Sequence, residues 1–180
     1  TMTPNIRKDL HTLLLHALQK FHRMCVEHEI EYWVCGGTLI GAVRHQGIIP
    51  HDDDLDVTVR EEHLDRLRGA CEESTFFSPL HEQEHWNGPD KQYSMMSVGA
   101  YSDRLAIDVF PSKLDEDDAV MASRAEVLPL RRVMFNGVEV MAPHKAEAFL
   151  QRTYGENVLT HVAIWSHDFN YDASLLHDRS

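Results

Sequence analysis

Four aspartates lie within five consecutive positions of this chain: Asp52, Asp53, Asp54 and Asp56. Crowded carboxylates repel one another and resist burial, yet these are interleaved with the apolar residues Leu55 and Val57. A bound cation would offset the repulsion, and ligation by oxygen alone favours Mg²⁺ or Mn²⁺ over zinc. The type and spacing of these residues therefore predict a divalent metal site.

Polar and apolar residues alternate along this stretch, which predicts a β-strand over residues 54–59. Side chains two positions apart share a face, with Cα atoms about 6–7 Å apart, so Asp54 and Asp56 can hold one or two cations between them. A second predicted strand, residues 104–110, carries Asp108 alone within an apolar run. If the two strands are neighbours, Asp108 completes a carboxylate triad. Such a triad can hold metal ions that activate an attacking hydroxyl and neutralise a phosphate leaving group.

A glycine turn precedes the acidic stretch, directly after a short strand predicted over residues 31–35. Thr38 is expected to cap a short helix over residues 39–43. The backbone N–H groups of Gly36, Gly37 and Thr38, helped by the helix dipole, can cradle a phosphate. The candidate second contacts to that phosphate are basic or imidazole side chains: Arg44, His45, Lys91 and Arg104. A surface ion pair is the competing interpretation of Arg44.

The remaining periodicities predict an α/β (α+β) fold, a small mixed sheet flanked by helices. Helices are predicted over residues 6–29, 61–72 and 144–153, and strands over residues 93–101, 132–135 and 138–141. Asn136-Gly137 predicts a type I′ hairpin turn between the last two strands. Residues 78–90 are rich in His, Glu, Gly and Pro, which predicts a loop.

Length and charge narrow the class of protein. The 180 residues suit one domain, residues 1–180, with its own core. A formal charge of −12 argues against a nucleic-acid partner, which requires Lys and Arg to neutralise phosphates. No apolar run approaches the roughly 20 residues of a membrane span, so we expect a soluble chain. The three cysteines lack a C-x-x-C pair and are predicted to be buried thiols: Cys25, Cys35 and Cys71.

Together, the glycine turn, the D-x-D strand and the later isolated aspartate match the layout of the nucleotidyltransferase fold. Residues 36–56, from Gly36-Gly37-Thr38 to Asp52-Asp53-Asp54-Leu55-Asp56, resemble the signature of the LicD family. This family includes bacterial phosphocholine transferases and the fukutin-related ribitol-phosphate transferases. Ile107-Asp108-Val109-Phe110-Pro111 resembles the second block of the family, and residues 152–160 resemble its C-terminal block.

The resemblance implies a metal-dependent phosphotransferase. Such an enzyme moves a phosphorylated alcohol from a CDP-linked or other nucleotide donor to a hydroxyl of a glycan or glycolipid acceptor. Asp54 and Asp56 would be metal ligands, and Asp108 would be a third ligand or the base for the acceptor hydroxyl. Asp52 and Asp53 would support the ligands or face the substrate.

Two other functions stay open at this stage. A small nucleotidyltransferase that moves NMP from an NTP to a hydroxyl would use the same carboxylates. A non-catalytic domain could hold Ca²⁺ or another regulatory metal with them. The alcohol, the acceptor, the compartment and the oligomeric state are not predicted by the residues.

Two further groups of residues have side chains that can bind a metal or another ligand. His81-Glu82-Gln83-Glu84-His85 matches the zinc motif H-E-x-x-H, which needs a stable helix. Because Pro79 and Gly88-Pro89 leave barely two turns, we expect a chance match. Near the C-terminus, four side chains could edge a base- or choline-binding pocket, against ordinary packing as the alternative: His161, Trp165, His167 and Asp168.

Overall fold

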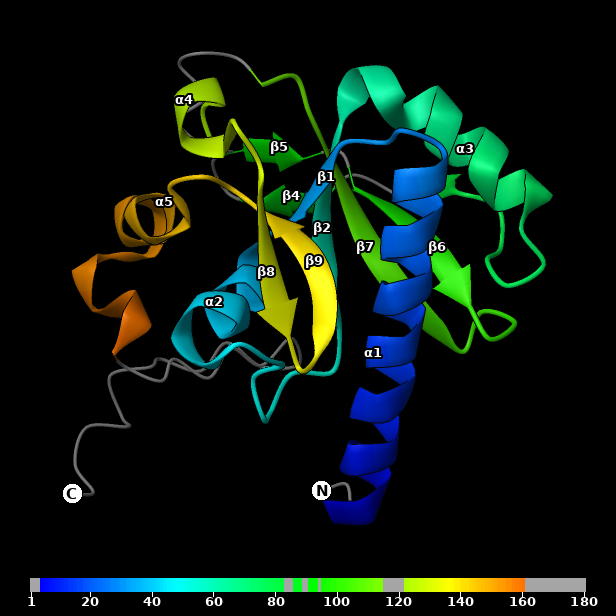
Figure 1. The fold of residues 1–180 in the computed structure, drawn as a ribbon, viewed down its shortest axis with the longest axis horizontal. Helices are drawn as coiled ribbons and strands as arrows, with labels where there is room; N and C mark the ends of the chain where they lie inside the picture. Colours follow the sequence, from blue (N-terminus) through cyan, green and yellow to red (C-terminus); the bar gives the residue numbers. More distant parts are fainter. Residues whose placement is uncertain (1–3, 83–85, 89–90, 94, 115–121, 161–180) are drawn as a thin grey trace.

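A five-stranded mixed sheet is the centre of the fold, which we describe from a computed structural model (Figure 1). The structure describes residues 4–82, 86–88, 91–93, 95–114 and 122–160. The strand order is β1-β2-β7-β6-β3, in which only β2 and β7 run parallel. The strands are β1 (Tyr32–Val34), β2 (Asp56–Arg60), β7 (Leu105–Ser112), β6 (Met96–Ala100) and β3 (His81–Glu82).

Helices and two small hairpins surround this sheet. The helices are α1 (Pro4–Glu27), α2 (Gly36–His45), α3 (Leu64–Glu73), α4 (Arg124–Val127) and α5 (Ala146–Tyr154), with 3₁₀ turns η1 (Glu61–His63) and η2 (Glu156–Leu159). The hairpins pair β4 (Trp86–Gly88) with β5 (Lys91–Tyr93) and β8 (Arg131–Phe135) with β9 (Val138–Ala142). The predicted mixed α/β class is therefore confirmed. Among the helices that the structure describes, none combines the length and apolar character that a membrane crossing requires.

The pleat of the sheet separates a core face from a polar face. Leu55, Val57 and Val59 are fully buried on the core face, as their alternation predicts. Asp56 and Asp108 lie on the other face, which we call the acid face. Thr58 belongs to the acid face by alternation but is also fully buried.

Helix α1 closes the core face, where it lies in front of the sheet in Figure 1. Its apolar stripe, which includes Leu14, Leu18 and Phe21, is almost completely buried. The ring of Phe21 meets Tyr32 and Phe77 edge to face, with centroids 5.3 and 6.2 Å apart. Truncation of a residue such as Phe21 to alanine would cost about 3–5 kcal/mol, because little can collapse into the space.

Three sequence predictions of local structure need correction. Residues 78–90 are not one loop, because β3 and β4 lie within them. The strand predicted over residues 93–101 is divided into β5 and β6. Helix α4 was not predicted, although Ser123 and Glu126 form a capping box that the sequence already contains. The type I′ turn is confirmed, since Asn136 and Gly137 have φ of 47° and 82°.

The three cysteines are free thiols. Cys25 and Cys71 are buried as predicted, and Cys35 is half-buried.

Candidate metal and phosphate site

Three carboxylates converge at the start of β2, two of them on the neighbouring strands β2 and β7. Asp56 and Asp108 are register partners in the parallel pair β2–β7, and Asp54 precedes β2 by two residues. One ligand oxygen from each of Asp54, Asp56 and Asp108 lies within 4.8 Å of the others. The structure therefore brings together the triad that the sequence predicts.

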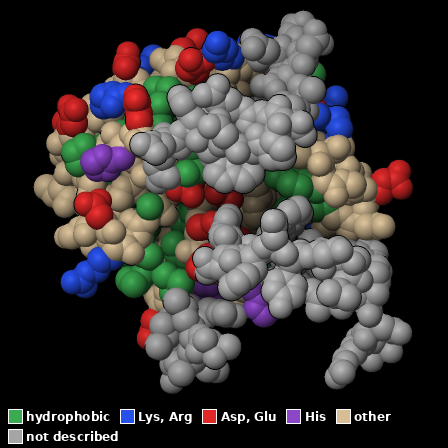
Figure 2. Space-filling model, turned by 180° about the vertical axis from the view of Figure 1, so that it is seen from behind, with side chains coloured by type: hydrophobic (Ala, Val, Ile, Leu, Met, Phe, Trp, Pro, Cys, Tyr) green, Lys and Arg blue, Asp and Glu red, His purple; other side chains and the backbone are tan. Residues whose placement is uncertain are grey.

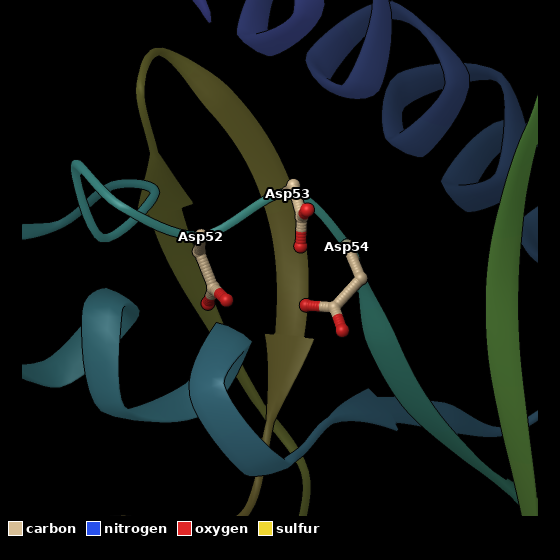
Figure 3. Close-up of side chains that lie close together, drawn as sticks. All are labelled: Asp52, Asp53 and Asp54. Carbon is tan, nitrogen blue, oxygen red and sulfur yellow. The ribbon is translucent and has the colours of Figure 1, made fainter. Parts of the chain in front are cut away.

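A second group of acids adjoins the first. One oxygen each from Asp52, Asp53 and Asp54 also lies within 4.8 Å of the others. Figure 3 shows these three side chains extending from the segment before β2 into the space beside α2. Seen from behind, acidic side chains show near the centre of the molecule (Figure 2). Asp54 belongs to both groups and links them.

The pKa of Asp56 is strongly raised by its surroundings. Burial raises the pKa of Asp56 to about 8, and the charges of Asp54, Asp108 and Asp52 add to that rise. A hydrogen bond donated by the Gly37 N–H to the Asp56 carboxylate acts in the opposite direction. Ionised carboxylates at this spacing need a cation to offset their repulsion. The donor set consists of hard oxygens and fits Mg²⁺ or Mn²⁺.

The glycine turn lies directly against the acids. Gly36 has a φ of +50°, and a Cβ on it would lie 2.5 Å from Oδ2 of Asp56. A Cβ on Gly37 would lie 2.7 Å from Oδ2 of Asp52. The backbone of the turn can approach the carboxylates this closely only because both residues lack a side chain.

Thr38 has a different role from the predicted one. Helix α2 begins at Gly36 after the extended residue Cys35, so Thr38 lies inside the first turn and is not the N-cap. Its buried hydroxyl accepts a hydrogen bond of 2.9 Å from the Asp56 N–H. The Thr38 hydroxyl therefore makes a tertiary contact with β2 instead of capping the helix, the role that local propensity predicts. The contact fixes the first residue of β2 against the start of α2.

The other predicted phosphate contacts lie apart from the turn. Arg44 and His45 occupy the last turn of α2, roughly 12 Å from Gly36 along the helix axis. The Nε2 atom of His45 lies 3.1 Å from the carbonyl oxygen of Ile48, within hydrogen-bond distance. The structure thus does not bring Arg44 and His45 to the glycine turn.

Two further basic candidates lie in other parts of the chain. Arg104 is exposed in the turn before β7. Lys91 begins β5, and its side chain lies outside the part of the chain that the structure describes.

The H-E-x-x-H motif does not form a zinc helix. His81 and Glu82 make up β3, so the first two residues of the motif are extended and face opposite sides of the sheet. His85 lies outside the described residues, as do the C-terminal residues His161, Trp165, His167 and Asp168. Within the described ranges, the clusters with metal-ligand spacing consist of aspartates.

Two residues that the sequence did not single out hold the acid loop, which we define as residues 46–55. The side chain of Asn136 accepts a hydrogen bond of 2.8 Å from the Ile48 N–H. The backbone N–H of Asn136 donates to the Gln46 carbonyl at 2.7 Å. On the other side, Nε2 of His11 lies 2.8 Å from the Asp52 carbonyl. The Asn-Gly pair signalled a turn, but no local pattern signals these long-range contacts.

Comparison with known proteins agrees with this geometry. A family model described as LicD/FKTN/FKRP, nucleotidyltransferase domain, matches residues 29–145, which include the glycine turn and all three carboxylates. The chain belongs to the LicD family. The expected resemblance is confirmed, and the LicD match begins just before β1 and ends just before α5.

Curated relatives in the LicD family include an uncharacterized protein, RP689, of Rickettsia prowazekii, 30% identical over 80% of this chain and 55% of that protein. The lipopolysaccharide cholinephosphotransferase LicD of Haemophilus influenzae is 41% identical over 41% of this chain and 25% of its own length. Human ribitol 5-phosphate transferase FKRP is 28% identical over 72% of this chain and 28% of its own length. The chain thus spans between a quarter and about half of these relatives.

Solved structures show the fold independently. The crystal structure of ANT(2″)-Ia in complex with adenylyl-2″-tobramycin has a TM-score of 0.54 at 15% identity, covering 81% of this chain and 86% of that one. A solution structure of the antibiotic-resistance factor ANT(2″)-Ia has a TM-score of 0.56 at 14% identity, covering 83% of each chain. The nucleotidyltransferase fold predicted for this LicD chain is therefore confirmed.

Proposed function

We propose that this chain is a metal-dependent phosphotransferase that moves a phospho-alcohol, such as phosphocholine or ribitol phosphate, from a CDP-linked donor to a hydroxyl of a glycan or glycolipid. The observation that carries the proposal is the convergence of Asp54, Asp56 and Asp108 beside the glycine turn. Family membership supports it, since the named relatives are a cholinephosphotransferase and a ribitol 5-phosphate transferase.

The donor pyrophosphate would lie at the N-terminus of α2. N–H groups at the N-terminus of α2, with the helix dipole, would favour an anion in a chain whose formal charge is −12. Asp54, Asp56 and Asp108 would hold Mg²⁺ or Mn²⁺, which would neutralise charge on the phosphates and on the leaving group. Asp52 and Asp53, on the same segment, would face the bound donor.

The reaction would be a displacement at phosphorus. The acceptor hydroxyl oxygen forms a bond to the phosphorus that bears the alcohol, and the bond from that phosphorus to the oxygen of CMP breaks. The acceptor proton would pass to a carboxylate, a role that we assign to Asp108 as the alternative to metal ligation, and CMP leaves. Catalysis then rests on positioning and on charge stabilisation, as in other phosphoryl transfers.

Transfer of NMP from an NTP is a second candidate. It is favoured by the structural likeness to ANT(2″)-Ia, whose crystal structure contains adenylyl-2″-tobramycin. A non-catalytic metal-binding role is the alternative from another class and would require only the aspartates.

A thermal-shift screen separates these functions. The ligands are CDP-choline, CDP-ribitol, CDP-glycerol, UDP-sugars and NTPs, each with Mg²⁺, with Mn²⁺ and with EDTA. A ligand at a hundred times its dissociation constant stabilises the folded state by about 2.7 kcal/mol, so a specific donor gives a clear shift. We expect a metal-dependent shift with a CDP-alcohol. A shift with NTPs alone would favour NMP transfer, and Ca²⁺ binding with no nucleotide shift would favour the non-catalytic role.

A further inference from the structure

A row of polar side chains crosses the acid face from the catalytic carboxylates to the edge of the sheet. Asp108 is the register partner of Asp56 on one side and of Ser97 on the other. Ser97 in turn is paired with His81 of the edge strand β3. Register partners share a face of the sheet, so Asp56, Asp108, Ser97 and His81 form one continuous row.

Exposure differs along this row and beside it. Ala106, two residues before Asp108 on the same face, is exposed and contributes only a methyl group. Its register partner on β6, Gly99, is buried beside the side chains of Asp103 and Ser78. His81 is exposed, whereas Ser97 is 8% exposed. Among these described residues, Ala106 and His81 are therefore the accessible positions beside the row and at its end.

The residue that follows His81 on β3 faces the opposite side of the sheet and offers a matched control. Glu82, the next residue of β3, faces α3, where its carboxylate lies 3.7 Å from the guanidinium of Arg68. Alternation along the strand thus separates His81 from this surface ion pair. The H-E dipeptide of the zinc-like motif is divided between two faces with different surroundings.

The row extends away from the donor side of the site. The glycine turn lies against Asp56, at the end of the row opposite to His81. In phosphoryl transfer the attacking and leaving oxygens are roughly in line on opposite sides of phosphorus. With the nucleotide leaving on the side of the glycine turn, the attacking hydroxyl would arrive from the side of Asp108, Ser97 and His81. Two strand spacings separate His81 from Asp108, about 10 Å.

We propose that Ser97 and His81 form the acceptor subsite of this chain. A polyhydroxylated acceptor lies across β6 and β3, with one hydroxyl at Asp108 and others hydrogen-bonded to the Ser97 hydroxyl and the His81 ring. This subsite rests on the proposed function, because it assumes that the donor binds at the glycine turn. The imidazole and the hydroxyl each donate and accept, which suits sugar hydroxyls in several orientations.

The first test measures transfer kinetics with CDP-choline, Mg²⁺ and methyl galactoside as the acceptor probe. His81→Ala and Ser97→Ala are each expected to raise the KM for methyl galactoside about tenfold, the effect of one lost hydrogen bond. His81→Gln, which keeps a donor and an acceptor, is expected to recover part of that loss. Glu82→Gln on the same strand is the control and should retain the wild-type KM.

The second test does not require turnover. Ring signals of His81, assigned by their loss in His81→Gln, are followed by NMR during titration with methyl galactoside, methyl glucoside and ribitol. We expect a saturable shift with at least one of them. If no CDP-alcohol is turned over, the proposed function fails, while a shift at His81 still supports the subsite. The subsite is overturned if the His81 signals stay unchanged with all three probes, or if the variants raise the KM for CDP-choline instead.

Discussion

Asp56 and Asp108 are direct register partners in the parallel pair β2–β7, although they lie far apart in the chain. Adjacent strands place their backbones about 4.8 Å apart, so the two carboxylates meet without any loop to adjust their separation. Each charge disfavours the ionisation of the other, and Asp54 adds a third. The fold therefore brings together carboxylates whose ionisation is unfavourable in free energy until a cation binds.

The first prediction concerns stability without metal. The native pKa of Asp56, about 8, is above its ordinary value of 3.8, so its ionisation opposes folding. This cost is absent below about pH 4, grows as the pH rises toward about 8, and is then constant. Asp56→Asn should therefore be more stable than wild type at pH 8 in EDTA, by several kcal/mol, and nearly equal at pH 4. Urea unfolding at both pH values checks this, and an equal difference at both would contradict it.

The second prediction concerns turnover. Asp54→Asn, Asp56→Asn and Asp108→Asn should each lower the rate of CMP release from the CDP-alcohol by roughly 10³-fold or more, through lost charge stabilisation. Each variant should remain folded by circular dichroism. Asp65→Asn, an exposed aspartate on α3, is the matched control and should keep the wild-type rate. A triad variant that keeps the wild-type rate would remove its residue from the mechanism.

The third prediction tests the glycine turn. Gly36→Ala puts a Cβ 2.5 Å from Oδ2 of Asp56 at a φ of +50°, so we expect a loss of about 1–3 kcal/mol in unfolding free energy. Gly69→Ala is the matched control, because a Cβ there meets nothing within 4 Å inside α3. It should stabilise the chain by about 0.5–1 kcal/mol. Thermal unfolding of both variants measures the contrast, and equal shifts would show that the turn tolerates a side chain.

The fourth prediction concerns the contact between α4 and α5. The guanidinium of Arg152, 2.8 Å from Glu126, together with the Ser123 cap, lowers the pKa of Glu126 to about 2, despite the opposing effect of burial. A lowered native pKa contributes stability above the ordinary value of 4.5, and this stability is lost as the pH falls from about 4.5 to about 2. Glu126→Gln should therefore lose about 1–2 kcal/mol at pH 7, discounted because Arg152 is partly exposed, and much less near pH 2. Chemical denaturation of both proteins at pH 7 and near pH 2 measures this difference in unfolding free energy. An equal loss at both pH values would exclude the ion pair as its cause.

Local periodicity was enough to predict part of the site. Alternation around Leu55 and Val57 gave the strand and placed Asp54 and Asp56 on one face. Asp108 was predicted as a site residue because it is an isolated acid within an apolar run. The register of β2 with β7 is non-local, so only the fold could show that Asp56 and Asp108 meet.

The sequence predictions were wrong where tertiary contacts compete with local preference. Thr38 is a good cap by propensity, but its hydroxyl binds the Asp56 N–H. Helix α2 begins at Gly36 and ends at His45, so it extends beyond the predicted residues 39–43 in both directions. The bonds of His11 and Asn136 to the acid loop join distant segments, and no spacing in the sequence encodes them.

The most direct test of the central claim is a Mn²⁺ titration followed by electron paramagnetic resonance of the free ion. If Asp54, Asp56 and Asp108 form one metal site, wild type binds Mn²⁺, and Asp56→Asn and Asp108→Asn each weaken that binding at least about tenfold. Asp65→Asn should bind as wild type does. Equal Mn²⁺ binding by wild type, Asp56→Asn and Asp108→Asn would contradict the account.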